Sequence, residues 1–168
     1  MSKVPDRQHT VNIEASETRL RTPAGDAFSG FVVRLLRLNG LLTAEGDALA
    51  RPAGQTSARW QVLAMVEDAP ATVAQIARTL GLARQSVQRV ADVLERAGLI
   101  AYMGNPHHRR ARLVSLTGEG RAALGSIQAA QRPWANAMGH AVGERELRRA
   151  SKVLDSLLEV MSGPPRQP

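Results

Sequence analysis

Residues 72–116 contain the pattern that most constrains how this chain can fold. Two short segments with helical spacing of apolar residues meet at Gly81. Thr72 and Gln75 stand at the two positions of a capping box, in which side chains and backbone at a helix start exchange hydrogen bonds. Glycine is the residue that most readily adopts the left-handed backbone of a tight turn. The pattern predicts two helices joined by a tight turn, the second running from near Ala83 to Gly98.

Two candidate strands follow the second helix. They are Leu99–Met103 and Arg112–Leu116, and the segment between them, 104–110, is too polar for a core. Two helices followed by a hairpin is the order of elements in a winged helix-turn-helix, which places its second helix in the DNA major groove. We therefore expect residues 53–117 to form a winged helix-turn-helix DNA-binding lobe.

Positive charge is concentrated in the same stretch. The chain has a net charge of +7, and residues 78–112 hold seven arginines against Asp92 and Glu95, a net charge of +5. A local excess of this kind is typical of a surface that binds phosphates. The alternative interpretation is an ordinary solvated basic face.

Long helical segments with broad apolar faces flank the lobe on both sides. Asp26 is expected to cap the first, which forms a helix over 26–52, and we expect Pro133 to kink or break the helical region 118–162. The last helix of the region 118–162 has apolar residues at the alternating three- and four-residue spacing that is typical of helix packing. Faces this broad predict contact with a partner as well as with the chain itself. A monomeric core closed by the same helices is the alternative. Residues 1–25 are expected to form a flexible arm and 163–168 a tail.

Composition narrows the class of protein and its compartment. There is no cysteine, so disulfides, thiolate metal sites and cysteine redox switches are excluded. The acidic residues near the N-terminus do not fit a signal peptide, and no apolar run approaches the ~18–20 residues that span a bilayer. We expect a cytoplasmic protein with no membrane partner.

No set of residues predicts catalysis. The sequence shows no nucleophile with its base, no paired carboxylates and no phosphate-binding loop, so we expect no enzyme activity and no cofactor. His107 and His108 invite a metal site. Adjacent side chains on a hairpin tip diverge, however, and no nearby carboxylate or cysteine completes a ligand set, so no bound metal is expected.

Motifs around the hairpin are more specific than the module alone. Gly98-Leu99-Ile100 is followed by Asn105-Pro106-His107-His108-Arg109-Arg110-Ala111 and then by Leu113-Val114-Ser115-Leu116-Thr117. Upstream stand Ala74-x-x-Ala77-x-x-Leu80-Gly81 and Leu94-Glu95-x-x-Gly98-Leu99. With these motifs the chain resembles the MarR family of transcriptional regulators over roughly residues 28–161. The resemblance implies a mainly α fold with a small β-hairpin wing, in which the winged helix-turn-helix is embedded in an intertwined all-helical dimerisation region.

The resemblance also implies how such a protein works. Members are homodimers, and twofold symmetry would set two recognition helices about 34–36 Å apart on a pseudo-palindromic operator. Repression is the implied default, relieved or modulated by a small aromatic or anionic effector. The candidate effector pocket, for which plain core is the alternative, comprises Phe31, Trp60, Met65, Trp134 and Met138.

Candidate DNA contacts lie on the second helix and on the wing. Arginine pairs with guanine and glutamine with adenine in the major groove. On the helix we expect double-stranded DNA to be contacted by Arg84, Gln85, Ser86, Gln88 and Arg89, with an internal salt bridge to Asp92 or Glu95 as the alternative for Arg89. On the wing the candidates are His107, His108, Arg109 and Arg110.

The chain departs from the family pattern at three places. Ala83 replaces a capping residue, Tyr102 replaces an arginine on the strand that enters the wing, and Asn105 and His108 replace acidic wing residues. We expect Tyr102 and His108 to replace the brace that the usual arginine and acidic residue would form. An alternative function is a dimeric interaction protein that no longer reads DNA specifically.

Overall fold

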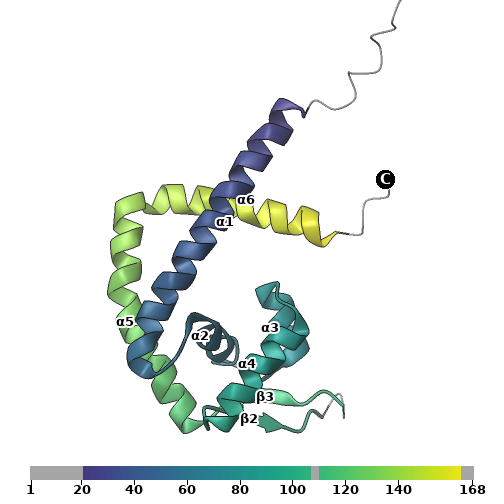
Figure 1. Ribbon diagram of the computed structural model, residues 1–168, viewed down its shortest axis with the longest axis vertical. Helices are drawn as coiled ribbons and strands as arrows, with labels where there is room; N and C mark the ends of the chain where they lie inside the picture. Colours follow the sequence, from purple (N-terminus) through teal and green to yellow (C-terminus); the bar gives the residue numbers. More distant parts are fainter. Residues whose placement is uncertain (1–20, 107–109, 164–168) are drawn as a thin grey trace, which may run out of the picture. The chain divides into compact units, whose positions relative to one another are not determined.

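The computed structural model describes residues 21–106 and 110–163 (Figure 1). The chain divides into two compact units, the first ending at Leu42 and the second beginning at Thr43. The fold is mainly α-helical with a small antiparallel sheet, and this confirms the predicted fold class.

The first helix, α1, spans Pro23–Ala50 and begins three residues before the predicted cap. The hydroxyl of Thr22 accepts a hydrogen bond from the Gly25 N–H at 3.1 Å, and Asp26 lies within the first turn. The expectation that Asp26 caps this helix is therefore wrong. Proline is favoured at the first helical position because its fixed φ suits a helix and its missing N–H would have no partner there.

Along its length α1 is strongly apolar and largely exposed. In α1 only Gly46 and Ala50 are buried. The segment Pro23–Ala53 is long and apolar enough to cross a membrane, with a mean hydropathy of 1.2 over 18 residues. This corrects the expectation that no apolar run reaches that length, because Arg34 and Arg37 interrupt the run without abolishing it. A core helix of a water-soluble protein passes the same test, so composition alone assigns α1 to neither environment.

The core of the second unit lies between short helices. These are α2 (Ser57–Ala64), α3 (Val73–Leu80) and α4 (Arg84–Arg96), and they pack with the beginning of α5 (Gly118–Val142). Leu63, Ile76, Leu94, Leu124 and Ile127 are the largest fully buried side chains, followed by Val62, Val87 and Val114. The alternating apolar residues of the four helices thus meet in one core.

Capping residues set where the helices of this core begin. After the 3₁₀ turn Arg51–Ala53, the Thr56 hydroxyl accepts from the Arg59 N–H at 3.4 Å, so Thr56 rather than Ser57 caps α2. The Asp47 carboxylate accepts the Ser57 N–H at 2.7 Å, which satisfies another free donor of the same helix end. The predicted capping box of Thr72 and Gln75 is present at the start of α3.

The predicted hairpin forms with a third, very short strand. The strands are β1 (Ala71–Thr72), β2 (Ile100–Met103) and β3 (Leu113–Leu116), in the antiparallel order β1-β3-β2. Ile100 pairs with Leu116 and Met103 with Leu113. The sheet ties the start of α3 to the wing through β3.

Thr117 connects the sheet to α5. Its hydroxyl accepts the Gly120 N–H at 3.0 Å and donates to the Gly98 carbonyl at 2.7 Å. Gly120 is buried, and a Cβ added there would overlap the carbonyl oxygen of Leu99. A glycine is therefore required where α5 crosses the start of β2.

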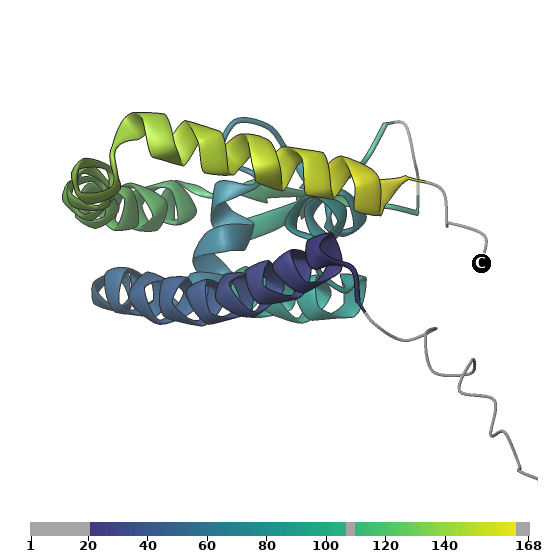
Figure 2. The same cartoon turned by 90° about the horizontal axis from the view of Figure 1, so that it is seen from above.

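The second long helix of the C-terminal region follows a corner. Pro133 lies inside α5 and does not end it, and the chain turns at Gly143, which has a φ of +92°. Figure 2 shows α6 (Glu144–Ser162) leaving the end of α5 at this corner. No residue of α6 is buried.

Candidate nucleic-acid interface

Helix α4 separates an apolar face from a polar face. Val87, Ala91 and Leu94 are at most 1% exposed, whereas Arg84, Gln85, Ser86 and Arg89 are exposed. Leu82 is 47% exposed, because it lies in the turn before the helix begins. The four exposed polar residues at the start of α4 are therefore available to a ligand.

The first turn of α4 has no side-chain cap. Ala83 occupies the N-cap position and makes no side-chain hydrogen bond, because an alanine side chain has no acceptor atom. The first N–H groups of a helix have no partner within it, and together with the helix dipole they favour an anion. Arg84, in the same turn, adds a full positive charge.

Gln88 is half-buried, and its side chain is hydrogen-bonded within the chain. Its side-chain amide donates to Asp92 Oδ1 at 2.7 Å and to the Tyr102 hydroxyl at 2.7 Å. The Tyr102 hydroxyl also donates to Asp92 Oδ1, at 3.3 Å. The three side chains form a closed polar cluster between α4 and β2. Sequence reasoning missed it, although the four-residue spacing of Gln88 and Asp92 on one helix was a usable signal.

Tyr102 is held from both sides. Burial raises the pKa of its phenol above the ordinary 10.0, and the negative charge of Asp92 adds to this effect. The Arg112 guanidinium lies over the ring, 4.7 Å from its centroid, and donates to the Tyr102 carbonyl at 3.2 Å. The partners of Tyr102 are thus Gln88, Asp92 and Arg112. His108, its predicted partner, lies outside the described residues.

Arginines from the helix and the wing surround a small hollow. A cavity of about 160 Å³ is lined by Arg84 from α4, Tyr102 from β2 and Arg110 and Arg112 from the wing, together with Thr72, Val73, Ala74, Gln88 and Ala111. All three guanidinium-bearing residues are exposed. Three cations around one hollow attract an anion such as a backbone phosphate.

Of the remaining predicted DNA contacts, the structure describes Arg89 and Arg110. Arg89 Nε donates to the Gln85 carbonyl at 3.4 Å, and among the described residues Arg89 takes part in no ion pair, so the alternative salt bridge to Asp92 or Glu95 does not form. Arg110 is exposed on the wing. The other wing candidates, His107, His108 and Arg109, lie outside the described residues.

Four of the candidate effector residues lie in the second unit and differ in exposure. Trp60 and Met65 are half-buried against the core of the lobe, Trp134 is half-buried on α5, and Met138 is 47% exposed. Phe31 belongs to the first unit. A hollow of about 520 Å³ at the corner of α5 and α6 is lined by none of them. The effector pocket stays a prediction. Within the described ranges, no three His, Asp or Glu side chains are grouped to hold a metal.

The short core helices, the three-stranded sheet and the exposed polar face of α4 together define a winged helix-turn-helix protein. A family model described as MarR family matches residues 53–111. Two uncharacterized proteins, Rv2011c of Mycobacterium tuberculosis and Mb2034c of Mycobacterium bovis, are each 44% identical over 102 residues, which is 61% of this chain and 71% of theirs. The chain belongs to the MarR family of transcriptional regulators.

Solved structures show the same fold. The MarR family transcription regulator SP03579 has a TM-score of 0.69 and 25% identity, over 82% of this chain and 91% of that one. The Mycobacterium tuberculosis regulator MosR, solved in complex with DNA, has a TM-score of 0.66 and 26% identity over 79% and 98%. CouR of Rhodococcus jostii, solved with p-coumaroyl-CoA, is 22% identical with a TM-score of 0.65 over 82% and 94%, a likeness of fold.

Proposed function

We propose that this protein is a sequence-specific regulator that binds double-stranded DNA as a homodimer on a pseudo-palindromic operator, most simply as a repressor. One observation carries the proposal. The exposed polar face of α4 lies beside a hollow that three arginines surround, with cations from both the helix and the wing. A helix face of this chemistry suits base edges, and the flanking cations suit the phosphates on either side.

Within that interface the exposed residues take different roles. Gln85 stands in the first turn of α4, where base edges in the major groove are read, and Arg84 beside it lines the hollow and suits a phosphate. Ser86 and Arg89 are exposed on the same helix and suit phosphate oxygens. Arg110 extends the positive charge onto the wing, where Arg109 is its predicted companion. The wing therefore adds affinity, and the helix adds sequence discrimination.

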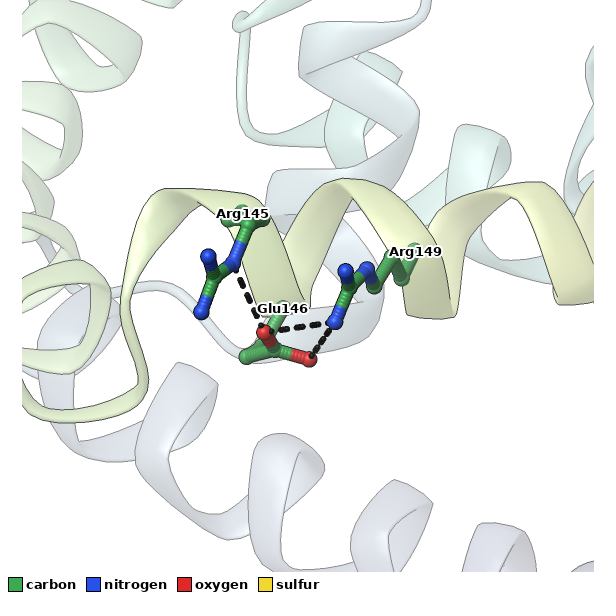
Figure 3. A network of polar contacts seen from close by, with 3 residues as sticks. All are labelled: Arg145, Glu146 and Arg149. Carbon is green, nitrogen blue, oxygen red and sulfur yellow. Dashed lines mark hydrogen bonds and ion pairs between the residues drawn. The ribbon is translucent and has the colours of Figure 1, made fainter.

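The homodimer is supported by α6. The charges at the start of this helix pair with one another: Glu146 binds Arg145 at 3.1 Å and Arg149 at 3.0 Å (Figure 3), and Glu144 binds Arg148 at 2.7 Å. Its apolar residues are left exposed, among them Leu147, Val153, Leu158, Val160 and Met161. An amphipathic helix whose first charges pair among themselves and whose apolar side is bare suits a second copy of the same chain.

Regulation by a small molecule is the finer part of the proposal. CouR, of the same fold, has been solved with p-coumaroyl-CoA. In this chain the aromatic and methionine residues of α1, α2 and α5 are the candidates to line a pocket for an aromatic or anionic effector. We place the protein in the cytoplasm and assign it no catalytic role, since its interface residues suit binding alone.

A salt series tests the DNA-binding step directly. We expect wild-type protein to bind its own upstream region more tightly than a random duplex, with affinity falling as salt rises. Arg84→Ala should weaken both complexes and lower the slope of log affinity against log salt by about one, as should Arg109→Ala on the wing. Arg51→Ala, which removes the same charge at an exposed position outside α4, the wing and α6, is the control. Absence of any shift at low salt would contradict the proposal and favour a dimeric interaction protein.

A further inference from the structure

Both amide hydrogens of Gln88 are already engaged within the chain. Its nitrogen lies 2.7 Å from Asp92 Oδ1 and 2.7 Å from the Tyr102 hydroxyl. A carboxylate oxygen only accepts hydrogen bonds, so the nitrogen of the amide, not its oxygen, must face Asp92. Because Gln88 is half-buried, solvent competes weakly for these bonds.

This arrangement conflicts with a base-reading role. Glutamine reads adenine by donating an N–H to N7 while its oxygen accepts from N6. In this structure both donors of Gln88 are used, so such a pair would first require a bond to Asp92 or Tyr102 to break. Gln85, one turn earlier, is exposed and carries no such commitment.

The cluster also joins the two DNA-contacting parts. Gln88 and Asp92 belong to α4, whereas Tyr102 belongs to β2, the strand that leads into the wing. Arg112, where the chain returns from the wing, lies over the Tyr102 ring. A helix and a wing that engage DNA together bind best when their relative placement is set beforehand.

We propose that Gln88 is a positioning residue that fixes the wing strand against the recognition helix through the Tyr102 hydroxyl, and that it reads no base. The inference rests on the proposed DNA-binding function. It differs from the sequence prediction, which placed Gln88 among the residues that contact DNA. It makes Tyr102, at a departure from the family pattern, a determinant of operator affinity.

A double-mutant cycle tests this role in the full-length protein. Binding is measured for wild type, Gln88→Ala, Tyr102→Phe and the double variant, on the operator, on single-base variants of it and on a random duplex. Gln85→Ala is the matched control, since it makes the same chemical change on the exposed face. Circular dichroism confirms that each variant is folded.

We expect each single variant to weaken operator binding by about threefold to tenfold, the range of one lost hydrogen bond. The ranking of the single-base variants should stay as in wild type, and the double variant should bind about as weakly as the weaker single variant. Gln85→Ala, in contrast, should change the ranking at one base pair.

Two results would overturn the inference. A changed base preference at one position in Gln88→Ala, not reproduced by Tyr102→Phe, would identify Gln88 as a reader. Effects that multiply in the double variant would show that the two side chains act separately. If wild type itself does not prefer the operator to a random duplex, the proposed function fails and the inference fails with it. The same cycle on urea unfolding, without DNA, then shows whether the Gln88–Tyr102 bond forms.

Discussion

The lobe and the C-terminal helix use similar apolar residues with opposite results. In the lobe, Leu63, Ile76 and Leu94 are at most 1% exposed. In α6, leucines and valines also recur at helical spacing, but no residue of this helix is buried. The lobe is built of short elements that fold back on one another, whereas α6 is a single helix of 19 residues. Helical spacing therefore predicts an apolar face. Whether other elements of the same chain cover that face depends on how the elements are connected.

The largest effect is expected in the core of the lobe. Leu94→Ala should lower the free energy of unfolding by about 2–5 kcal/mol, because Leu94 is fully buried and its loss leaves a cavity. Leu82→Ala is the control: the same change at a residue 47% exposed should cost less than about 0.5 kcal/mol. Urea unfolding measures both. Equal losses would mean that Leu82 belongs to the core after all.

The second prediction concerns the bare face of α6. Leu158 is 63% exposed in one chain, so Leu158→Asp should leave the fold intact if the protein were a monomer. In the proposed dimer it would bury an unpaired charge and weaken self-association by about 100-fold or more. Analytical sedimentation would measure the loss of self-association, and an operator-binding assay would measure the loss of DNA binding that follows from it. Ser156→Asp places the same charge on a different side of the helix and should have little effect. A Leu158→Asp protein that stays dimeric would rule out this face as the interface.

Smaller changes in stability are expected for two glycines of α5, the helix that connects the lobe to α6. The two substitutions should change the free energy of unfolding in opposite directions. Gly120→Ala should destabilise the protein by about 1–3 kcal/mol, because its Cβ would overlap the Leu99 carbonyl oxygen. Gly125→Ala, on the same helix with open space around it, should stabilise by about 0.5–1 kcal/mol. Thermal unfolding distinguishes them. A neutral Gly120→Ala would show that α5 can move away from β2 at no cost.

The smallest effect is a pH dependence of the lobe. Burial raises the pKa of Tyr102, so between its unfolded value of 10.0 and the higher folded value the folded state holds more protons. The contribution is fully present below pH 10 and is lost as pH rises through the folded pKa. Unfolding free energy should therefore fall as the pH rises above 10.0, and less steeply in Tyr102→Phe. Parallel curves would show that Tyr102 does not contribute.

Much of the fold was predictable because local signals agreed. The capping box of Thr72 and Gln75, the turn at Gly81 and the cap at Thr117 each act over a few residues, and the structure has all three. Asp26 failed as a cap because Thr22, directly before the first helical residue, takes that role and Asp26 lies within the first turn. Of the two effects expected of Pro133, the break does not occur, since α5 continues on both sides of it.

The candidate interface was predictable only in part. Exposure of Arg84, Gln85, Ser86 and Arg89 follows from the helical period of α4. The hydrogen bond between Gln88 and Tyr102 does not follow from that period, because the two residues are 14 apart and meet only when β2 packs on α4. Contacts between elements depend on tertiary packing, which the spacing along a single helix does not encode.

The unbroken helix α5 has a mechanical consequence. It starts beside the wing strand at Thr117 and ends at the corner before α6, and its 25 residues, with Pro133 among them, make a strut about 37 Å long measured along the helix. A tilt of about 5° at one end of such a strut moves the other end by about 3 Å. In the proposed dimer, a small rearrangement near α6 would thus be magnified at the wing, where the spacing between half-sites tolerates little displacement.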